Sequence, residues 1–332
     1  MGYPYGSSNF MALPPSKPTP PSDIWAEWLL HRRHGGDPKQ QPVIRDFAWR
    51  IGERVLDGAQ LAFGQTLVDV GTGDGLVAFG AIQRVGPSLK LIFTDLSAAL
   101  LECARERAGE LGVLEQCTFL QTRAEQLEGV ADGSADALTT RAVLAYVPDK
   151  AAAARQMYRV LKPGGRVSIG EPIHQDEAVK LAGLTHALRT RPPDAVTAPV
   201  RLLQRCRALQ LPSTIAEIQA NPLTNFTERD LFALFLKAGF KDIHLELHLD
   251  LRQGAPVLWE TFIDTAPSPG VPTLREAFGS QLSEIERKQI EEWLRPQVES
   301  GSYTERSAVA YLTAVKGHSQ MAQLDAQGGD YF

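Results

Sequence analysis

Glycines and acids alternate in the stretch LVDVGTGDGLVAFG, residues 67–80. Its first four residues are mostly apolar and predict a buried strand, whereas the apolar spacing over residues 76–85 predicts a helix. Three glycines lie between them, Gly71, Gly73 and Gly75. Because glycine lacks a Cβ atom, such a turn tolerates positive φ and lets a ligand approach the backbone closely. Strand, glycine turn and helix together are typical of a nucleotide site.

Two further positions indicate which nucleotide such a site would take. Asp95 ends the next apolar run, LIFTD, about 20 residues after the last glycine, where an acid can bind ribose hydroxyls. A dinucleotide fold requires a small third residue where this chain has Leu76. Asp74, inside the turn, would repel a pyrophosphate but suits a cofactor with a cationic amino-acid end. The spacing therefore disfavours NAD.

The chain resembles the class I S-adenosylmethionine (SAM) methyltransferases over residues 67–172. After the glycine turn, four segments resemble that family in order and spacing: TDLSAALLECARERAGELG, TFLQTRAEQL, DALTTRAVLAYVPD and LKPGGRVSIGEP. The chain is most similar to bacterial small-molecule methyltransferases with a carboxyl-terminal cap. The resemblance implies an α/β, doubly wound, Rossmann-like sheet of seven strands in the order 3-2-1-4-5-7-6, with strand 7 antiparallel. It also implies methyl transfer from SAM to a small molecule.

The resemblance also implies which residues bind SAM. They are Asp69, Gly71, Thr72, Gly73, Asp95, Leu96, Ala124, Glu125, Arg141, Trp25 and Arg32. In the family, helices before the first strand lie across the cofactor mouth, which is why Trp25 and Arg32 belong to the set. Simple aromatic packing is the alternative for the tryptophan. Arg123 departs from the family, because an acid often occupies its place near adenine.

Little side-chain chemistry is needed, because SAM carries its own electrophile. The protein must align a nucleophile, exclude water and, for some acceptors, remove a proton. Glu171 and His174 are the candidate bases, and Tyr146 is expected to face the acceptor. Each has a structural alternative: a cap at a helix end for Glu171, a polar loop residue for His174, and packing against the next helix for Tyr146. The acceptor atom, O, N, S or activated C, stays open.

Two late segments test the implied topology. Residues 243–251 alternate strictly between apolar and polar, as in a half-exposed strand, whereas residues 307–316 are apolar or small almost throughout, as in a strand covered on both faces. The implied order places the first at the sheet edge and the second inside. His244, Glu246 and His248 have the residue types of a metal site, but a solvated edge strand explains them better. No metal site is predicted.

The chain divides into a core and inserted caps. The predicted units are a disordered Pro-rich tail (1–22), capping helices (23–60), the SAM-binding core (61–172), a helical lid (173–226), a core helix with strand 6 (227–254), a second cap (255–306), strand 7 (307–316) and a flexible tail (317–332). Strands 5 and 6 both end at the cofactor edge in this topology, so both insertions and the first helices should meet there as a lid. Arginines of the lid could bind an anion, although solvated arginines are the commoner case.

Composition limits the partners. A net charge of −5 gives no basic footprint for nucleic acid, and no apolar stretch reaches the length of a membrane span. Three unevenly spaced cysteines form neither a disulfide framework nor a zinc motif, which favours the cytoplasm. We expect a small-molecule acceptor as partner, with a homodimer as the assembly considered. The alternatives are an NAD(P)-dependent oxidoreductase and a SAM-binding protein without catalysis.

Overall fold

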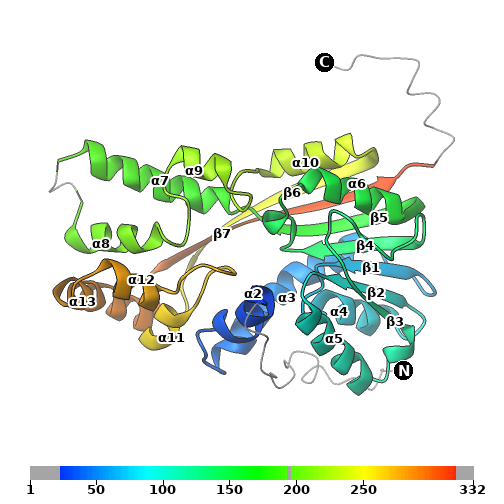
Figure 1. Ribbon diagram of the computed structural model, residues 1–332, viewed down its shortest axis with the longest axis horizontal. Coiled ribbons are helices and arrows are strands. Elements are labelled where there is room, and N and C mark those ends of the chain that lie inside the picture. The colour runs from blue at the N-terminus through cyan, green and yellow to red at the C-terminus, as the bar shows by residue number, and fades with distance from the viewer. Residues whose placement is uncertain (1–22, 193–195, 319–332) are drawn as a thin grey trace, which may run out of the picture.

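A seven-stranded sheet forms the centre of the computed structural model, which describes residues 23–192 and 196–318 (Figure 1). Its strands run in the order β3-β2-β1-β4-β5-β7-β6. They are β1 (Thr66–Val70), β2 (Lys90–Asp95), β3 (Cys117–Gln121), β4 (Ala135–Arg141), β5 (Leu161–Pro172), β6 (Phe240–Gln253) and β7 (Thr304–Lys316). The first five pair in parallel, and β7 lies antiparallel between β5 and β6. The predicted fold class is confirmed.

Helices cover both faces of the sheet because its inner strands have apolar residues on both sides. In β1, Leu67 faces a cluster formed with α3 (Gln40–Ala59), α4 (Leu76–Val85) and α5 (Ala98–Glu110). Val68 and Val70 face the opposite cluster, with α6 (Lys150–Val160) and α10 (Glu228–Lys237). A parallel sheet covered in this way leaves ligands only the edge at the strand ends.

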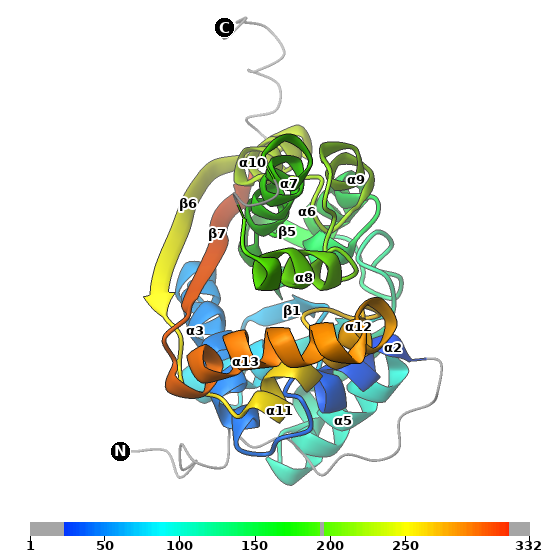
Figure 2. The same cartoon turned by 90° about the vertical axis from the view of Figure 1, so that its left-hand side faces the viewer.

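Two insertions form a helical cap beside the sheet (Figures 1 and 2). The first contains α7 (Gln175–Thr190), α8 (Ala198–Arg207) and α9 (Ile215–Ala220), and the second contains α11 (Trp259–Asp264), α12 (Leu274–Gln281) and α13 (Glu284–Ser300). Leu202 and Cys206 of α8 are buried against Trp259, Phe278 and Ile290 of the second insertion. The two insertions therefore share one apolar core.

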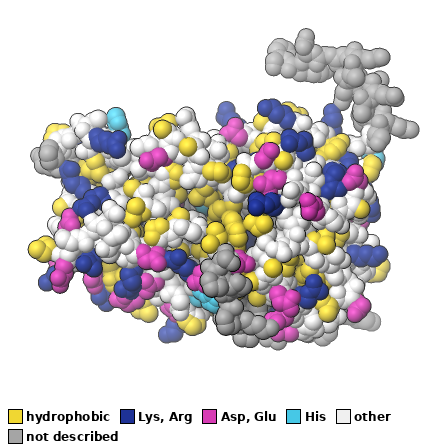
Figure 3. Space-filling view, in the orientation of Figure 1, with side chains coloured by type: hydrophobic (Ala, Val, Ile, Leu, Met, Phe, Trp, Pro, Cys, Tyr) yellow, Lys and Arg dark blue, Asp and Glu magenta, His cyan; other side chains and the backbone are white. Residues whose placement is uncertain are grey.

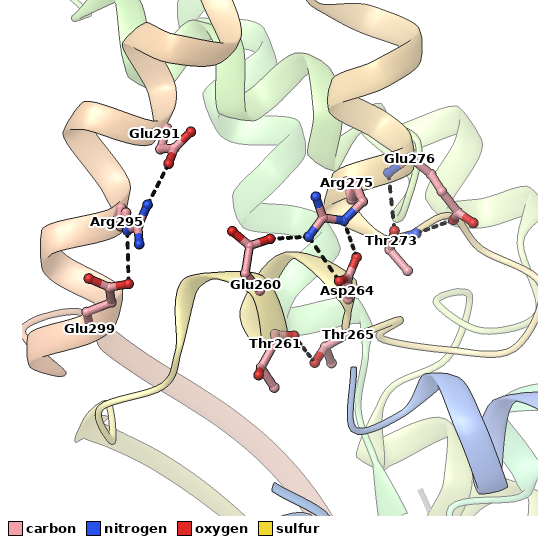
Figure 4. A network of polar contacts seen from close by, with 10 residues as sticks. All are labelled: Glu260, Thr261, Asp264, Thr265, Thr273, Arg275, Glu276, Glu291, Arg295 and Glu299. Atoms are coloured by element: carbon pink, nitrogen blue, oxygen red, sulfur yellow. Dashed lines mark hydrogen bonds and ion pairs between the residues drawn. The ribbon is translucent and has the colours of Figure 1, made fainter. Parts of the chain in front are cut away.

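Ion pairs and caps fix the second insertion internally (Figure 4). Arg275 of α12 binds both Glu260 and Asp264 of α11. Thr273 and Glu276 form a reciprocal capping box at the start of α12. Such boxes satisfy two otherwise free backbone donors and set where a helix begins.

The N-terminal segment packs between the core and this second insertion. It contains α2 (Ile24–Glu27) and a π-helical turn, η1 (Trp28–Arg32). The indole nitrogen of Trp28 donates to the Ala266 carbonyl at 2.9 Å, and the Ala266 amide donates to the Arg32 carbonyl at 2.9 Å. Thr261 donates to Asp37 at 3.0 Å. The second insertion thus supports the segment that lies over the strand ends.

Strands β6 and β7 are longer than predicted, and the apolar face of β6 is more exposed than its pattern indicated. β7 is interior and β6 is the edge strand, as expected. However, Leu247, Leu249 and Leu251 on the apolar face of β6 are exposed, because α10 covers only the beginning of the strand. In the part of the chain described, no helix is both long and apolar enough to cross a bilayer. The tail predictions for residues 1–22 and 319–332 lie outside the described residues.

Candidate functional site

A cavity of about 340 Å³ lies at the carboxyl ends of β1, β2 and β4, beneath the N-terminal segment. Nine predicted site residues line it: Trp25, Gly71, Gly73, Asp95, Leu96, Ala124, Glu125, Arg141 and Tyr146. Five others are absent from its lining: Asp69, Thr72, Arg32, Glu171 and His174. The cavity thus brings together the glycine turn, the acid of β2 and the exit of β4.

The glycine turn has the backbone geometry that its sequence predicts. Gly71 and Gly73 both have positive φ, +64° and +57°. A Cβ atom on Gly71 would lie 2.3 Å from a methyl of Val143, so no larger residue fits there. The Gly73 amide donates to Asp95 at 2.8 Å, and the Thr72 amide donates to the Thr94 carbonyl at 3.0 Å. The turn is therefore held against β2.

Asp69 lies beneath the turn and does not reach the cavity. Its two carboxylate oxygens accept hydrogen bonds from the hydroxyls of Thr72 and Thr139, each at 2.7 Å. Burial raises the pKa of Asp69 to about 6, although both hydroxyl bonds act in the opposite direction. Asp69 and Thr72 thus join β1, the turn and β4 from inside, which differs from the direct cofactor contact predicted for them.

Asp95 is the acid that faces the cavity. Besides the Gly73 amide, its carboxylate accepts the Ser97 amide at 2.9 Å. An ionised carboxylate has about four acceptor positions, so it can accept a bond from a ligand as well as bonds from the backbone. Burial raises the pKa of Asp95, and the neighbouring carboxylate of Asp23 adds to that effect. Asp23 also accepts the Ser97 hydroxyl at 2.6 Å, which ties the N-terminal segment to this strand end.

The third strand supplies the opposite wall. Thr122, Arg123, Ala124 and Glu125 follow β3 and line the cavity with Leu96. Leu96 and Ala124 contribute the apolar part of this wall. Arg123 is exposed to solvent at the rim, so it is both a surface residue and a wall residue.

Aromatic rings close the side nearest β4. Trp25 and Tyr146 meet edge to face at 5.2 Å between centroids, and both line the cavity. Burial raises the pKa of Tyr146 to about 12, with the nearby Glu171 carboxylate contributing, so its phenol is neutral. The ring of His174 lies 6.4 Å from that of Tyr146, and His174 does not itself line the cavity. Burial lowers the pKa of His174, which favours the neutral imidazole at pH 7.

Arginines surround a second, smaller cavity of about 30 Å³ beside the glycine turn. Arg33, Arg45 and Arg141 line it, together with one carboxylate, Asp74. Arg45 forms an ion pair with Asp74. The Nε atoms of Arg45 and Arg141 are buried without a hydrogen-bond partner among the described residues. Burial, followed by the charge of Arg141, lowers the pKa of Arg33 to about 10. The lining thus has more positive than negative charge.

The predicted Arg32 points away from both cavities. It pairs with Glu276 of α12 at 2.6 Å on the surface of the protein. Its neighbour Arg33 takes the buried place, with its guanidinium 5.2 Å from the ring of Trp28. Sequence reasoning missed Arg33 and Arg45. For Arg33, the only indication in the sequence was its place beside Arg32. For Arg45, the sequence gave no indication, because a polar residue near the start of a helix is ordinarily solvated.

Glu171 is fully buried and binds the backbone of the turn that follows β4. Its carboxylate accepts the amides of Val143, Leu144 and Ala145 at 3.1, 3.0 and 2.9 Å. Burial raises the pKa of Glu171 to about 7, while these amides and Lys150 act to lower it. The carboxylate therefore caps the turn η3 (Leu144–Tyr146), which carries Tyr146. This geometry supports the capping alternative and disfavours Glu171 as a base that touches the acceptor.

Two arginines of the first insertion bind carboxylates. Arg205 pairs with Glu286 at 2.8 Å, and Arg207 forms an ion pair with Glu177. Figure 3 shows that both signs of charge are interspersed on this face and that apolar side chains gather near its centre. An anion site made of lid arginines is not supported.

Comparison with known proteins agrees with the site. Residues 46–181, less than half of the chain, match the model of the ubiE/COQ5 methyltransferase family. The ubiquinone/menaquinone biosynthesis C-methyltransferase UbiE of Escherichia coli O1:K1 / APEC is 36% identical over 116 residues, which are 35% of this chain and 46% of that protein. The chain therefore matches about half the length of this curated relative. Residues 46–181 contain the glycine turn and all four later segments, so the match falls on the region whose motifs predicted a methyltransferase.

Two solved structures illustrate the wider likeness. The YcgJ protein of Bacillus subtilis has a TM-score of 0.49 and 18% identity, covering 82% of this chain and 100% of its own. Phosphoethanolamine N-methyltransferase 2 of Haemonchus contortus, in complex with SAM, has a TM-score of 0.48 and 18% identity, covering 88% of this chain and 56% of its own. Likeness at this level carries no conclusion about substrate.

Proposed function

We propose that this chain, whose residues 46–181 belong to the class I SAM-dependent methyltransferases, transfers the methyl group of SAM to a small-molecule acceptor. One observation carries the proposal. A single cavity has the glycine turn and Asp95 on one side and the aromatic pair of Trp25 and Tyr146 on the other. It can therefore hold a nucleoside and an apolar acceptor next to each other.

The cavity residues fit SAM by their chemistry. Asp95 has acceptor positions for two ribose hydroxyls, and the slot formed by Leu96 and Ala124 suits a flat base. Arg33 and Arg141 would hold the methionyl carboxylate, because buried cations need a compensating anion and Asp74 supplies only one. When bound, SAM supplies an electrophilic methyl on a sulfonium sulfur.

The acceptor side rests on Tyr146 and His174. We assign Tyr146 to contact with the acceptor, because its neutral ring lines the cavity opposite Trp25. His174, neutral at pH 7 and adjacent to that ring, can accept a proton from an acceptor that loses one. Glu171 becomes a positioning residue, since it fixes the turn from which Tyr146 projects.

Exclusion of water would fall to the inserted segments. We propose that the N-terminal segment and the two insertions act as a lid, because Ala266 of the second insertion binds the Trp28 indole and the Arg32 backbone carbonyl directly. Closure would strengthen the electrostatic interactions inside the site. A homodimer and a cytoplasmic location complete the proposal, and no nucleic acid is involved.

A ligand titration tests the class of cofactor first. Thermal stability of the purified chain is measured with SAM, S-adenosylhomocysteine and NAD, since a ligand that binds only the folded state raises it. We expect stabilisation by the first two alone, followed by transfer of labelled methyl in an acceptor screen. Stabilisation by NAD alone would make an oxidoreductase the better hypothesis. Binding of SAM without turnover of any acceptor would favour a non-catalytic SAM-binding protein.

Arg33 and Arg32 give a matched pair of variants for the carboxylate contact. Arg33→Ala should weaken SAM binding by about 10- to 100-fold, the usual range for a charged hydrogen bond. Arg32→Ala should leave the affinity unchanged, because that side chain pairs with Glu276 outside the cavities. Calorimetry with decarboxylated SAM is the decisive control, since its affinity should not respond to Arg33→Ala. Equal losses for the two variants would contradict the assignment.

A further inference from the structure

The edge strand β6 is long and uncovered. It has 14 residues and pairs with β7 on one side only, and Figure 2 shows it at the outer margin of the molecule. Leu247, Leu249 and Leu251 are 38, 54 and 70% exposed. Edge strands are usually short or interrupted, because free backbone groups beside apolar side chains invite pairing with another chain. In β6, an unpaired strand edge and exposed leucines occur together from Leu247 to Leu251.

The opposite face of the same strand alternates in charge. Glu246 and Asp250 are acidic, whereas Arg252 is basic and His244 and His248 can be protonated. Within the chain, Glu246 binds Arg54 of α3 and both histidines, and Asp250 binds Arg252 at 2.6 Å. The pattern along the strand is therefore a regular succession of unlike groups.

We propose that β6 of a second copy pairs with this strand in antiparallel fashion, about a two-fold axis at Leu249. Leu249 then lies opposite its own copy, and Leu247 lies opposite Leu251. On the other face, Glu246 lies opposite Arg252 and His248 opposite Asp250. The two sheets become one continuous sheet of two copies.

The symmetry of a sheet selects this register. Directly opposite residues have side chains on the same face, so a two-fold axis normal to the sheet must pass through a residue position. An axis at His248 would place Glu246 opposite Asp250 and His244 opposite Arg252, which pairs like charges. Axes at leucine positions pair unlike charges instead. Among the leucine positions, only an axis at Leu249 keeps all of these paired residues within the uninterrupted part of β6.

The neighbouring leucine registers run into the ends of β6. An axis at Leu247 places Arg252 opposite Asp242, where the backbone has a φ of +49° and the pairing with β7 is irregular. An axis at Leu251 places Leu247 opposite residue 255, beyond the end of the strand. The leucine strip should supply most of the affinity, and the charges should fix the register.

Light scattering and sedimentation over a range of concentrations test the assembly. We expect a dimer that dissociates on dilution, and Leu249→Arg should make the chain monomeric, because two arginines would meet on the axis. The control is Ile215→Arg on α9, at a site of comparable exposure, 57%. Circular dichroism and SAM binding verify that both variants are folded. A wild-type monomer at every concentration, or a dimer that survives Leu249→Arg, would overturn the proposal.

Charge reversal tests the register separately. Glu246→Arg and Arg252→Glu should each weaken the dimer, and the double variant should restore it. Leu249→Cys should form a disulfide-linked dimer on oxidation, whereas Leu247→Cys should cross-link only when mixed with Leu251→Cys. Failure of the double variant to restore the dimer would refute the Leu249 axis. SAM binding is expected to be unaffected throughout, so this outcome is independent of the methyltransferase proposal.

Discussion

The carboxyl ends of β2 and β5 carry two acids with similar local chemistry and different positions. Each carboxylate accepts hydrogen bonds from several backbone amides. Burial raises the pKa of both side chains. Asp95, 9% exposed, lines the cavity, whereas Glu171 has no exposed surface.

This difference teaches that access decides the role of a buried acid. The Glu171 carboxylate binds three amides of the turn that bears Tyr146, so its role is to hold that turn in place. Asp95 holds the glycine turn and keeps acceptor positions that face the cavity. A strand-end acid is thus a ligand contact only where neighbouring elements leave space in front of it.

The largest expected effect comes from removing the scaffold acid. Glu171→Ala leaves three buried amides without an acceptor, each costing roughly 1–3 kcal/mol, so we expect a loss of about 4 kcal/mol in the free energy of unfolding. Chemical denaturation measures it, with Glu53→Ala on the exposed face of α3 as control. Unchanged stability with abolished turnover would instead make Glu171 part of the chemistry.

The pH dependence of stability should differ between wild type and Glu171→Gln. The pKa of Glu171 is about 7 in the folded state against an ordinary 4.5, so the folded state binds the proton more tightly. Its contribution to stability is complete below pH 4.5 and is lost as the pH rises through 7, by about 3 kcal/mol. Glutamine does not titrate. The stability of wild type relative to the variant should therefore fall across this window, and parallel pH curves would contradict the shift.

Asp95→Ala should act on the ligand more than on the fold. Loss of two charged hydrogen bonds to ribose should weaken SAM binding by about 100-fold or more. Unfolding should be less affected than in Glu171→Ala, because Asp95 lines the cavity, where water can bind the amides that it leaves free. Calorimetric titration with SAM measures the change. Intact binding would remove Asp95 from the cofactor site.

The smallest effect is expected at His174, behind the acceptor wall. His174→Gln should lower kcat about tenfold, below the usual range for a direct general base, because the ring does not line the cavity. The KM for SAM should stay constant, and the acidic limb of the pH profile of kcat should flatten. An unchanged pH profile would make His174 a packing residue only.

Local patterns in the sequence were sufficient for the frame of the site. The apolar run, the three glycines and the helical spacing after them predicted the strand, the turn and the following helix, and Asp95 was correctly placed at the next strand end. The period of residues 243–251 predicted an edge strand but not which face would be covered. Coverage depends on where α10 ends, which is a tertiary property.

The choice between Arg32 and Arg33 shows the limit of periodicity. In an α-helix Arg32 would follow Trp28 on the same face. In the structure the Arg33 amide donates to the Trp28 carbonyl at 2.8 Å, and this π-helical turn places Arg33 on that face instead. A one-residue change in helical register cannot be seen in the spacing of side chains.

The sequence by itself determined the strand, the glycine turn, the following helix and the position of the acid at the end of β2, because these depend on contacts between near neighbours in the chain. Only the tertiary structure decided that Glu171 is closed off, that Arg33, Arg45 and Arg141 meet beside Asp74, and that three leucines of β6 stay exposed. Each of these depends on segments distant in sequence, and burial by such segments sets both the access and the pKa of a side chain.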